Sequence, residues 1–195
     1  EIAFDHYGNF FGVDNDADFT GEKERFVYIE QYTDLGWRSH WQYRGGGYNP
    51  WQDEQMHVPF YEGQPRWYTA PLGLYENGPA GFKANPGTAL GPEYDGYFFL
   101  TSAPNGQQWA FQIKPRGDSF AMVNDHKIGD GIPLVGLNFA PDGGLYGVDW
   151  GGGYPMNENG AIWRIDVPEA KANPLRAETR KWIGANLAGE EVASL

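Results

Sequence analysis

The chain has no cysteine and no long run of apolar residues. Without cysteine, its 195 residues hold no disulfide, thiolate nucleophile, cysteine-type zinc site or haem attachment site. No apolar stretch approaches the roughly 18 residues that a bilayer-spanning helix needs, so we expect no transmembrane segment. Basic residues are also scarce, with 14 Lys and Arg against 26 Asp and Glu. That balance argues against nucleic acid or an anionic membrane as a direct partner.

The net charge of −12 is open to two interpretations. It can simply keep the protein soluble, or some of the carboxylates can be calcium ligands. The chain begins with Glu1 and shows no signal peptide, so we expect a piece of a longer polypeptide.

Aromatic residues and turn formers are abundant. Aromatics make up 16% of the chain, and 28 glycines with 14 prolines account for roughly one residue in five. Many short strands joined by tight turns would have this composition, which predicts an all-β fold.

One short pattern, a glycine turn that leads into an aromatic strand, occurs three times. Residues 4–14 and 139–149 match at Phe, Gly, an aromatic and Gly-Val-Asp, and their turn glycines Gly8 and Gly143 lie 135 positions apart. A weaker copy at residues 94–100 has Gly96 at the turn. The intervals of 88 and 47 residues fit two blades and one blade of about 45 residues each. The repeat therefore predicts a β-propeller segment of about four blades.

Local patterns place several strands and one helix. Residues 10–14 and 25–29 are expected strands, and 97–101 with 109–113 form an expected hairpin around an Asn-Gly turn. Residues 145–149 and 161–167 form another. Asn173-Pro174 caps a helix expected to end at Gly189, with an apolar face of Leu175, Thr179, Trp182, Ile183, Asn186 and Leu187. We therefore expect a propeller segment over 1–168 and a separate helical segment over 169–195.

The densest cluster of carboxylates lies in residues 14–24. Oxygen ligands at alternating positions suit calcium. An EF-hand does not fit, because Phe19 occupies the glycine position and Arg25 the position of the bidentate Glu. A calcium site at a blade corner and a plain acidic surface loop both remain open.

A second candidate region follows at residues 34–40. Trp37 and Arg38 can lie at the mouth of a central channel, where an indole and a guanidinium would bind a sugar or quinone; they can equally be a packing residue and a surface charge. His40 is the best placed of the four histidines for a general base.

An ordered series of motifs resembles a known family. The motifs are residues 8–18, 21–25, 34–38, 78–81, 86–88 and 139–150. Together they look like the six-bladed propeller domain of the membrane-bound dehydrogenases, also called PVC-type haem-binding proteins, which are relatives of the glucose/sorbosone dehydrogenases. Residues 173–195 are similar to the start of the HEAT-type helical repeats that follow the propeller in many members.

The resemblance implies an exported, periplasmic bacterial protein that binds pyrroloquinoline quinone and calcium and oxidises a sugar or alcohol. Electrons would pass to a haem domain, for which this segment has no attachment site. The resemblance implies that Asp16, Glu22 and Glu24 of the acidic loop, with Asp34 and Trp37 of the following turn, correspond to the calcium-binding region. The candidate metal ligands are then Asp14, Asp16, Glu22, Glu24 and Asp34, and the candidate cofactor contacts are Trp37 and Arg38. The implied catalytic histidine would precede Glu1.

Two departures from the family leave a second function open. A Tyr-Gly-Trp-Pro turn is usual in those relatives, whereas Leu35 and Arg38 replace the Tyr and the Pro here. The alternative is a non-catalytic propeller that binds or scaffolds a larger periplasmic or membrane-associated assembly. In either case we expect the segment to need further blades or another protein chain, because four blades do not close a six-bladed ring.

Overall fold

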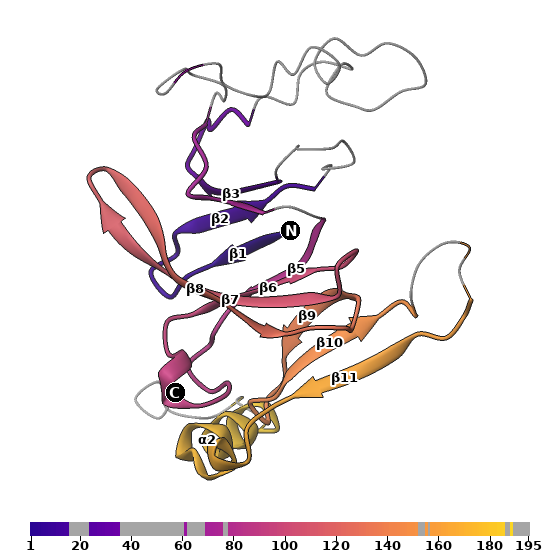
Figure 1. Cartoon of the computed structure of the whole chain (residues 1–195). Coiled ribbons are helices and arrows are strands. Elements are labelled where there is room, and N and C mark those ends of the chain that lie inside the picture. The colour runs from indigo at the N-terminus through magenta and orange to yellow at the C-terminus, as the bar shows by residue number, and fades with distance from the viewer. Residues whose placement is uncertain are drawn as a thin grey trace.

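The computed structural model describes residues 1–15, 24–35, 61, 69–75, 78–151, 155, 157–185 and 188. These residues form three antiparallel sheets and one C-terminal α-helix (Figure 1). The first sheet comprises β1 (Ile2–Phe4), β2 (Phe10–Val13), β3 (Glu24–Ile29) and β4 (Gly73–Tyr75). The second comprises β5 (Pro79–Ala84), β6 (Phe98–Ser102), β7 (Gln107–Arg116) and β8 (Ser119–Gly129). The third comprises β9 (Leu134–Phe139), β10 (Leu145–Asp149) and β11 (Ala161–Ile165).

Each sheet is a meander in which neighbours in sequence are neighbours in space. The sheets pack side by side in sequence order. Successive sheets meet along their first strands, β1 against β5 and β5 against β9 (Figure 1). The approach is close at Gly81 of β5, where a Cβ would lie 2.7 Å from the backbone nitrogen of Leu137 in β9. A glycine is needed at that crossing.

The three repeat glycines occupy equivalent places. Gly8, Gly96 and Gly143 each precede the second strand of a sheet and have φ of +84°, +73° and +78°. Glycine adopts this left-handed backbone at no steric cost. The recurrence predicted from the sequence is confirmed.

The predicted number of blades is not confirmed. The interval of 88 residues between Gly8 and Gly96 separates two successive sheets in the described part of the chain. It is long because residues 30–72 are inserted between β3 and β4 of the first sheet. The described residues thus form three sheets, where the sequence predicted about four.

The core consists of two apolar layers, one on each face of the second sheet. Side chains of β6 alternate between them, so that Phe98 packs toward the first sheet and Phe99 toward the third. The first layer is rich in aromatic rings: Phe11, Phe26, Phe82, Phe98 and Phe111 are all buried and in ring contact.

Both predicted hairpins are present. Leu100 of β6 lies opposite Trp109 of β7, and Leu145 of β10 lies opposite Ile165 of β11. Gly106, in the turn between β6 and β7, has φ +65°, which is the conformation that the Asn-Gly signal predicts.

The C-terminal helix α2 (Pro174–Ile183) begins as predicted but ends earlier than predicted. The Asn173 side chain accepts a hydrogen bond from the Leu175 backbone N–H at 3.0 Å, and Pro174 is the first helical residue. The helix ends at Ile183, and the N–H of the following Gly184 bonds back to the carbonyls of Arg180 and Trp182.

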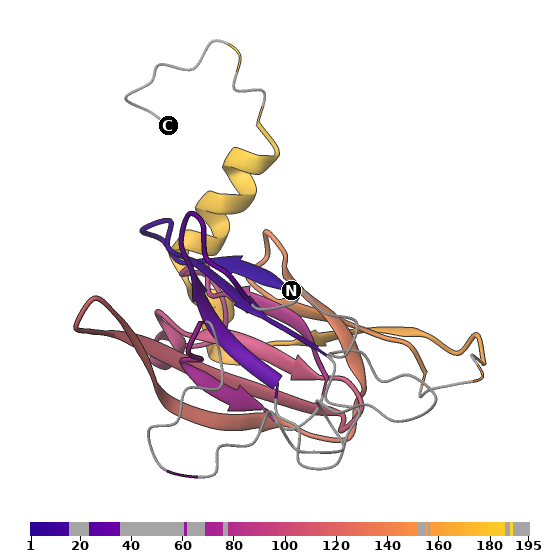
Figure 2. The ribbon, with the colours of Figure 1, turned by 90° about the horizontal axis from the view of Figure 1, so that it is seen from above.

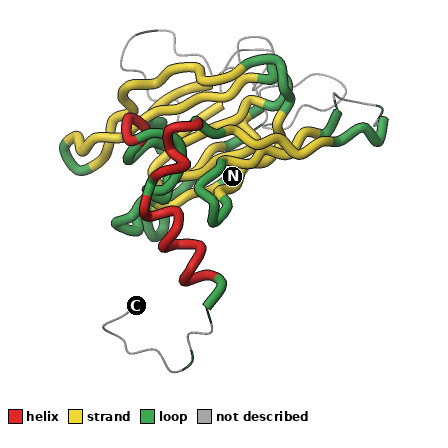
Figure 3. The backbone as a smooth tube through the Cα atoms, turned by 90° about the horizontal axis from the view of Figure 1, so that it is seen from below, coloured by secondary structure: helices red, strands yellow, loops and turns green. Residues whose placement is uncertain are grey.

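The predicted apolar face of α2 is not buried against the sheets. Leu175 is 49% and Ile183 66% exposed, whereas Arg176 is 1% exposed. The helix extends away from the sheets (Figures 2 and 3), so its apolar side chains have no sheet to cover. Asn186 and Leu187 of that predicted face, and the predicted end at Gly189, lie outside the described residues. One helix does not establish a HEAT-type region, and the boundary at residue 168 stays a prediction. No helix within the described ranges is long and apolar enough to cross a membrane.

Candidate functional site

Asp14, the first residue of the predicted calcium region, is held by Arg25. The two residues lie side by side at the ends of β2 and β3. The Asp14 carboxylate accepts hydrogen bonds from the Arg25 backbone N–H and from its Nε, both at 2.6 Å. The Arg25 guanidinium is buried and also donates to the Leu35 carbonyl at 2.9 Å. The charge of Asp14 is therefore already neutralised by a cation of the chain itself.

The other predicted calcium ligands do not gather in the described structure. Glu24 is buried in β3, and the backbone carbonyl of Asp34 accepts a hydrogen bond from Thr69 Oγ1 at 2.7 Å. Asp16 and Glu22 lie outside the described residues. Among the residues that are described, no three His, Cys, Asp or Glu side chains are grouped to hold a metal ion. The described carboxylates alone therefore do not complete a calcium site.

The predicted quinone contacts Trp37 and Arg38, and the candidate base His40, lie outside the described residues.

A cleft of about 580 Å³ opens between the first two sheets, on the side of the Gly8 and Gly96 turns. Its walls are mostly apolar and aromatic, and a smaller number of polar side chains line it. These lining residues include Asp5, His6, Tyr7, Tyr28, Tyr97, Gln112, Asp118, Ser119 and Phe120. Concave, largely apolar sites with a few polar groups are typical of small-molecule binding.

The sequence pattern did not predict this cleft. It identified Gly8 and Gly96 as turn residues, and their two turns contribute Tyr7 and Tyr97 to the lining. The signal was the aromatic residue beside each turn glycine. What the sequence did not show is that the β7–β8 hairpin supplies the facing wall through Phe120.

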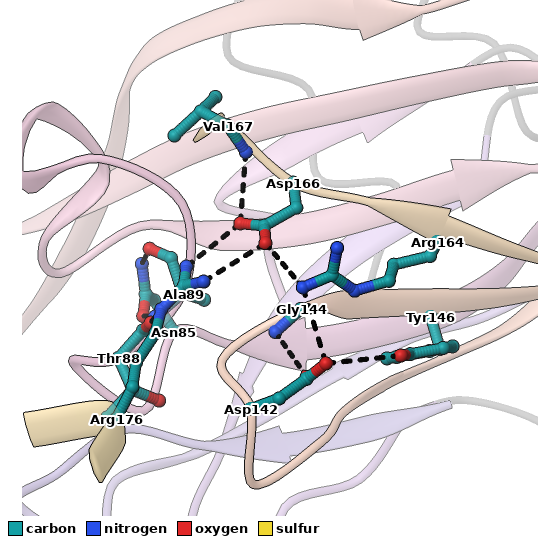
Figure 4. A network of polar contacts seen from close by, with 10 residues as sticks. All are labelled: Asn85, Thr88, Ala89, Asp142, Gly144, Tyr146, Arg164, Asp166, Val167 and Arg176. Atoms are coloured by element: carbon teal, nitrogen blue, oxygen red, sulfur yellow. Dashed lines mark hydrogen bonds and ion pairs between the residues drawn. The ribbon is translucent and has the colours of Figure 1, made fainter. Parts of the chain in front are cut away.

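A second polar cluster fastens α2 to the sheets (Figure 4). Arg176 donates from both terminal nitrogens to Asp166, at 3.0 and 2.9 Å, and from Nε to the carbonyl of Thr88 at 2.7 Å. Arg164 donates to the same Asp166 at 2.6 Å and forms an ion pair with Asp142 at 3.3 Å.

The two aspartates of this cluster are held in their charged form. Burial alone would raise the pKa of Asp166, but hydrogen bonds from Arg176 and the Val167 N–H, together with the charges of Arg176 and Arg164, lower it below its ordinary value. The pKa of Asp142 is also lowered, first by the hydrogen bond from the Gly144 N–H. Because each charge is matched by a partner, the cluster is suited to holding α2 in place and not to proton transfer.

No family model matches this chain, and no curated protein matches it. Among solved structures, it is similar to the crystal structure of a proposed oxidoreductase (glucose dehydrogenase) from Thermus thermophilus. The TM-score is 0.57 and the sequence identity 14%, over 84% of this chain and 43% of the other. The fold is propeller-like. At this identity the likeness concerns the fold alone, and this chain spans less than half the length of the Thermus protein.

Proposed function

We propose that this chain contributes part of an oxidoreductase-like propeller domain that acts on a sugar or a related alcohol. The observation that carries the proposal is the fold likeness to the Thermus protein, which covers 84% of this chain. The regular recurrence of the glycine turn in three successive sheets supports it, because the likeness then extends over repeated units. The narrower kinship, with the membrane-bound dehydrogenases and the glucose/sorbosone dehydrogenases, belongs to the same proposal.

In this proposal the cofactors are calcium and pyrroloquinoline quinone, in an exported bacterial protein. Asp16 and Glu22, with Glu24 and Asp34, would hold the metal, and Trp37 and Arg38 would contact the quinone. Asp14 is the weakest of the proposed ligands, because a cation there competes with Arg25 at 2.6 Å. The quinone would supply the redox chemistry, and a haem domain elsewhere would accept the electrons.

The test is thermal unfolding of the full-length protein with calcium and pyrroloquinoline quinone. A ligand at a hundred times its dissociation constant stabilises the folded state by about 2.7 kcal/mol, which raises the Tm of a domain of this size by roughly 5 to 10 °C. Glu22→Gln should remove most of this shift, while Glu178→Gln, an exposed carboxylate on α2, should leave it unchanged. Reduction of an artificial electron acceptor by aldoses should follow the same pattern.

The second candidate function is a non-catalytic propeller that binds or scaffolds a larger assembly. The observation in its favour is that Arg25 neutralises Asp14. The absence of a Tm shift, together with no acceptor reduction by aldoses or alcohols, would exclude the dehydrogenase and favour the scaffold.

A further inference from the structure

The cleft between the first and second sheets carries an inference that does not depend on the proposed dehydrogenase. Described residues from the first two sheets and their turns line it. We propose that this cleft binds an organic ammonium ion.

Aromatic rings supply the first part of the argument. Tyr28 and Phe120 pack edge to face at 4.9 Å, one from each sheet, and both rings are only partly buried. The rings of Tyr7 and His6 in the β1–β2 turn lie 3.9 Å apart, tilted by 41°, and line the same cleft. The negative faces of aromatic rings attract a cation that has been stripped of water, and quaternary ammonium groups are bound in this way.

The charges of the lining supply the second part. Asp5 and Asp118 line the cleft, and no Lys or Arg among the described residues does. This set of charges disfavours phosphates and carboxylic acids, pyrroloquinoline quinone with its carboxylates among them, and favours a positive ligand. The net charge of −12 also favours the approach of a positively charged ligand.

The third part of the argument is that some polar groups of the cleft are already hydrogen-bonded within the described part of the protein and others are not. The Asp5 carboxylate is fully engaged, accepting hydrogen bonds from the Tyr7 and Asn9 backbone N–H groups and from Asn9 Nδ2. Neither the Asp118 carboxylate nor the Tyr28 hydroxyl makes a hydrogen bond with any described residue. Asp5 therefore shapes the turn, and Asp118 and Tyr28 are left to meet a ligand.

The probe is choline, compared with 3,3-dimethylbutan-1-ol, which has the same shape and no charge. Calorimetric titration of the full-length protein at pH 8 and low salt should show choline binding at least tenfold tighter than the neutral alcohol, because only the cation gains from the aromatic faces and the carboxylate. Raising the salt to 0.5 M should weaken choline binding and leave the alcohol unaffected.

Two variants and a matched control locate the site. Asp118→Asn should weaken choline binding two- to threefold, since a partly solvated carboxylate contributes little, and Phe120→Leu should weaken it about fivefold. Glu178→Gln removes an exposed carboxylate of α2 outside the cleft and should change nothing.

Equal binding of choline and the alcohol, or no choline binding at 100 mM, would overturn the proposal. So would equal effects of Asp118→Asn and Glu178→Gln. If Phe120→Leu fails to fold, the comparison of the two probes and the Asp118 variant decide alone. The cofactor titration of the proposed function uses other residues, so either proposal can fail without the other.

Discussion

Gly143 meets two constraints at once, one from its own backbone and one from its surroundings. Its φ of +78° lies in the left-handed region that disfavours side chains. A Cβ at this position would also lie 2.2 Å from Nε of Arg176 and 2.4 Å from the Thr88 carbonyl. Gly8, at the equivalent turn, has a similar φ of +84° and nothing within 4 Å of its added Cβ.

Comparing alanine substitutions at Gly8 and Gly143 separates the cost of backbone strain from the cost of crowding by neighbouring atoms. We expect Gly8→Ala to lower the free energy of unfolding by about 1 kcal/mol, the cost of a left-handed alanine. Gly143→Ala should cost about 3 kcal/mol or more, because it must also displace the buried Arg176. Urea unfolding of both variants measures the difference. Equal losses of unfolding free energy in the two variants would show that crowding against Arg176 adds nothing to the cost of the substitution.

Asp166 gives the cluster around Arg176 a dependence on pH. The pKa of this carboxyl is lowered in the folded state, so its contribution to stability is present above the unfolded value of about 3.9 and is lost as the pH falls through the lower folded value. At pH 7, Asp166→Asn should destabilise the fold by about 3 kcal/mol, since it leaves the buried Arg176 without its charge partner.

The measurement is the difference in unfolding free energy between the wild type and Asp166→Asn from pH 7 to pH 3. The difference should be constant down to about pH 5 and should shrink as Asp166 becomes protonated. Asp130→Asn, which removes an exposed ion pair with Lys127, should change stability by less than 1 kcal/mol. A difference that is as large at pH 3 as at pH 7 would argue against this assignment.

For single residues, the sequence predicts those whose role depends only on their neighbours along the chain. The turn glycines are recognisable because the backbone itself requires them. Arg176 is not, because its partner carbonyl at Thr88 lies 88 residues away. For Asp14, an acidic run looks the same whether its carboxylates bind calcium or a nearby arginine, and only the fold places Arg25 beside it.

Among the elements, the hairpins were predictable and the packing of the helix was not. The Asn-Gly turn and the alternating strands are encoded within about 15 residues. The spacing of apolar residues in α2 is also local, but which face is buried depends on what lies beside the helix. The helix contacts the sheets through a buried arginine, and no periodicity of apolar residues could show that.

α2 depends on its cap, because a helix of ten residues is marginal by itself. Asn173→Ala removes the side-chain acceptor of the Leu175 N–H and should cost about 1 kcal/mol. The loss should be confined to the helix. Amide exchange in the first turn of α2 should accelerate about fivefold, and exchange in β6 and β7 should stay unchanged. Asn173→Ser keeps a capping oxygen and should behave like the wild type.

Across the whole molecule, equivalent repeat positions differ in burial in a systematic way. Val13 of β2 is 6% exposed and faces the second sheet, whereas its equivalent Val148 of β10 is 45% exposed. In the other direction, Leu145 of β10 is 1% exposed and its equivalent Phe10 of β2 only half-buried. The same repeat position is covered wherever a neighbouring sheet exists. The outer faces of the first and third sheets are thus the two faces of the repeat that no described sheet covers.

These two faces predict self-association. Phe4 and Ile2 on the first sheet, and Ile162 and Val148 on the third, are exposed apolar side chains. In the 195-residue chain alone, the third sheet of one copy should pack on the first sheet of another, giving oligomers at micromolar concentration in sedimentation experiments. Ile162→Thr should weaken this association roughly tenfold, because a buried isoleucine contributes more than about 1.4 kcal/mol. Tyr32→Asn, which removes an exposed aromatic ring from the turn after β3, should not. A chain that stays monomeric at 100 µM and unfolds in one cooperative transition would show that the exposed faces need no partner.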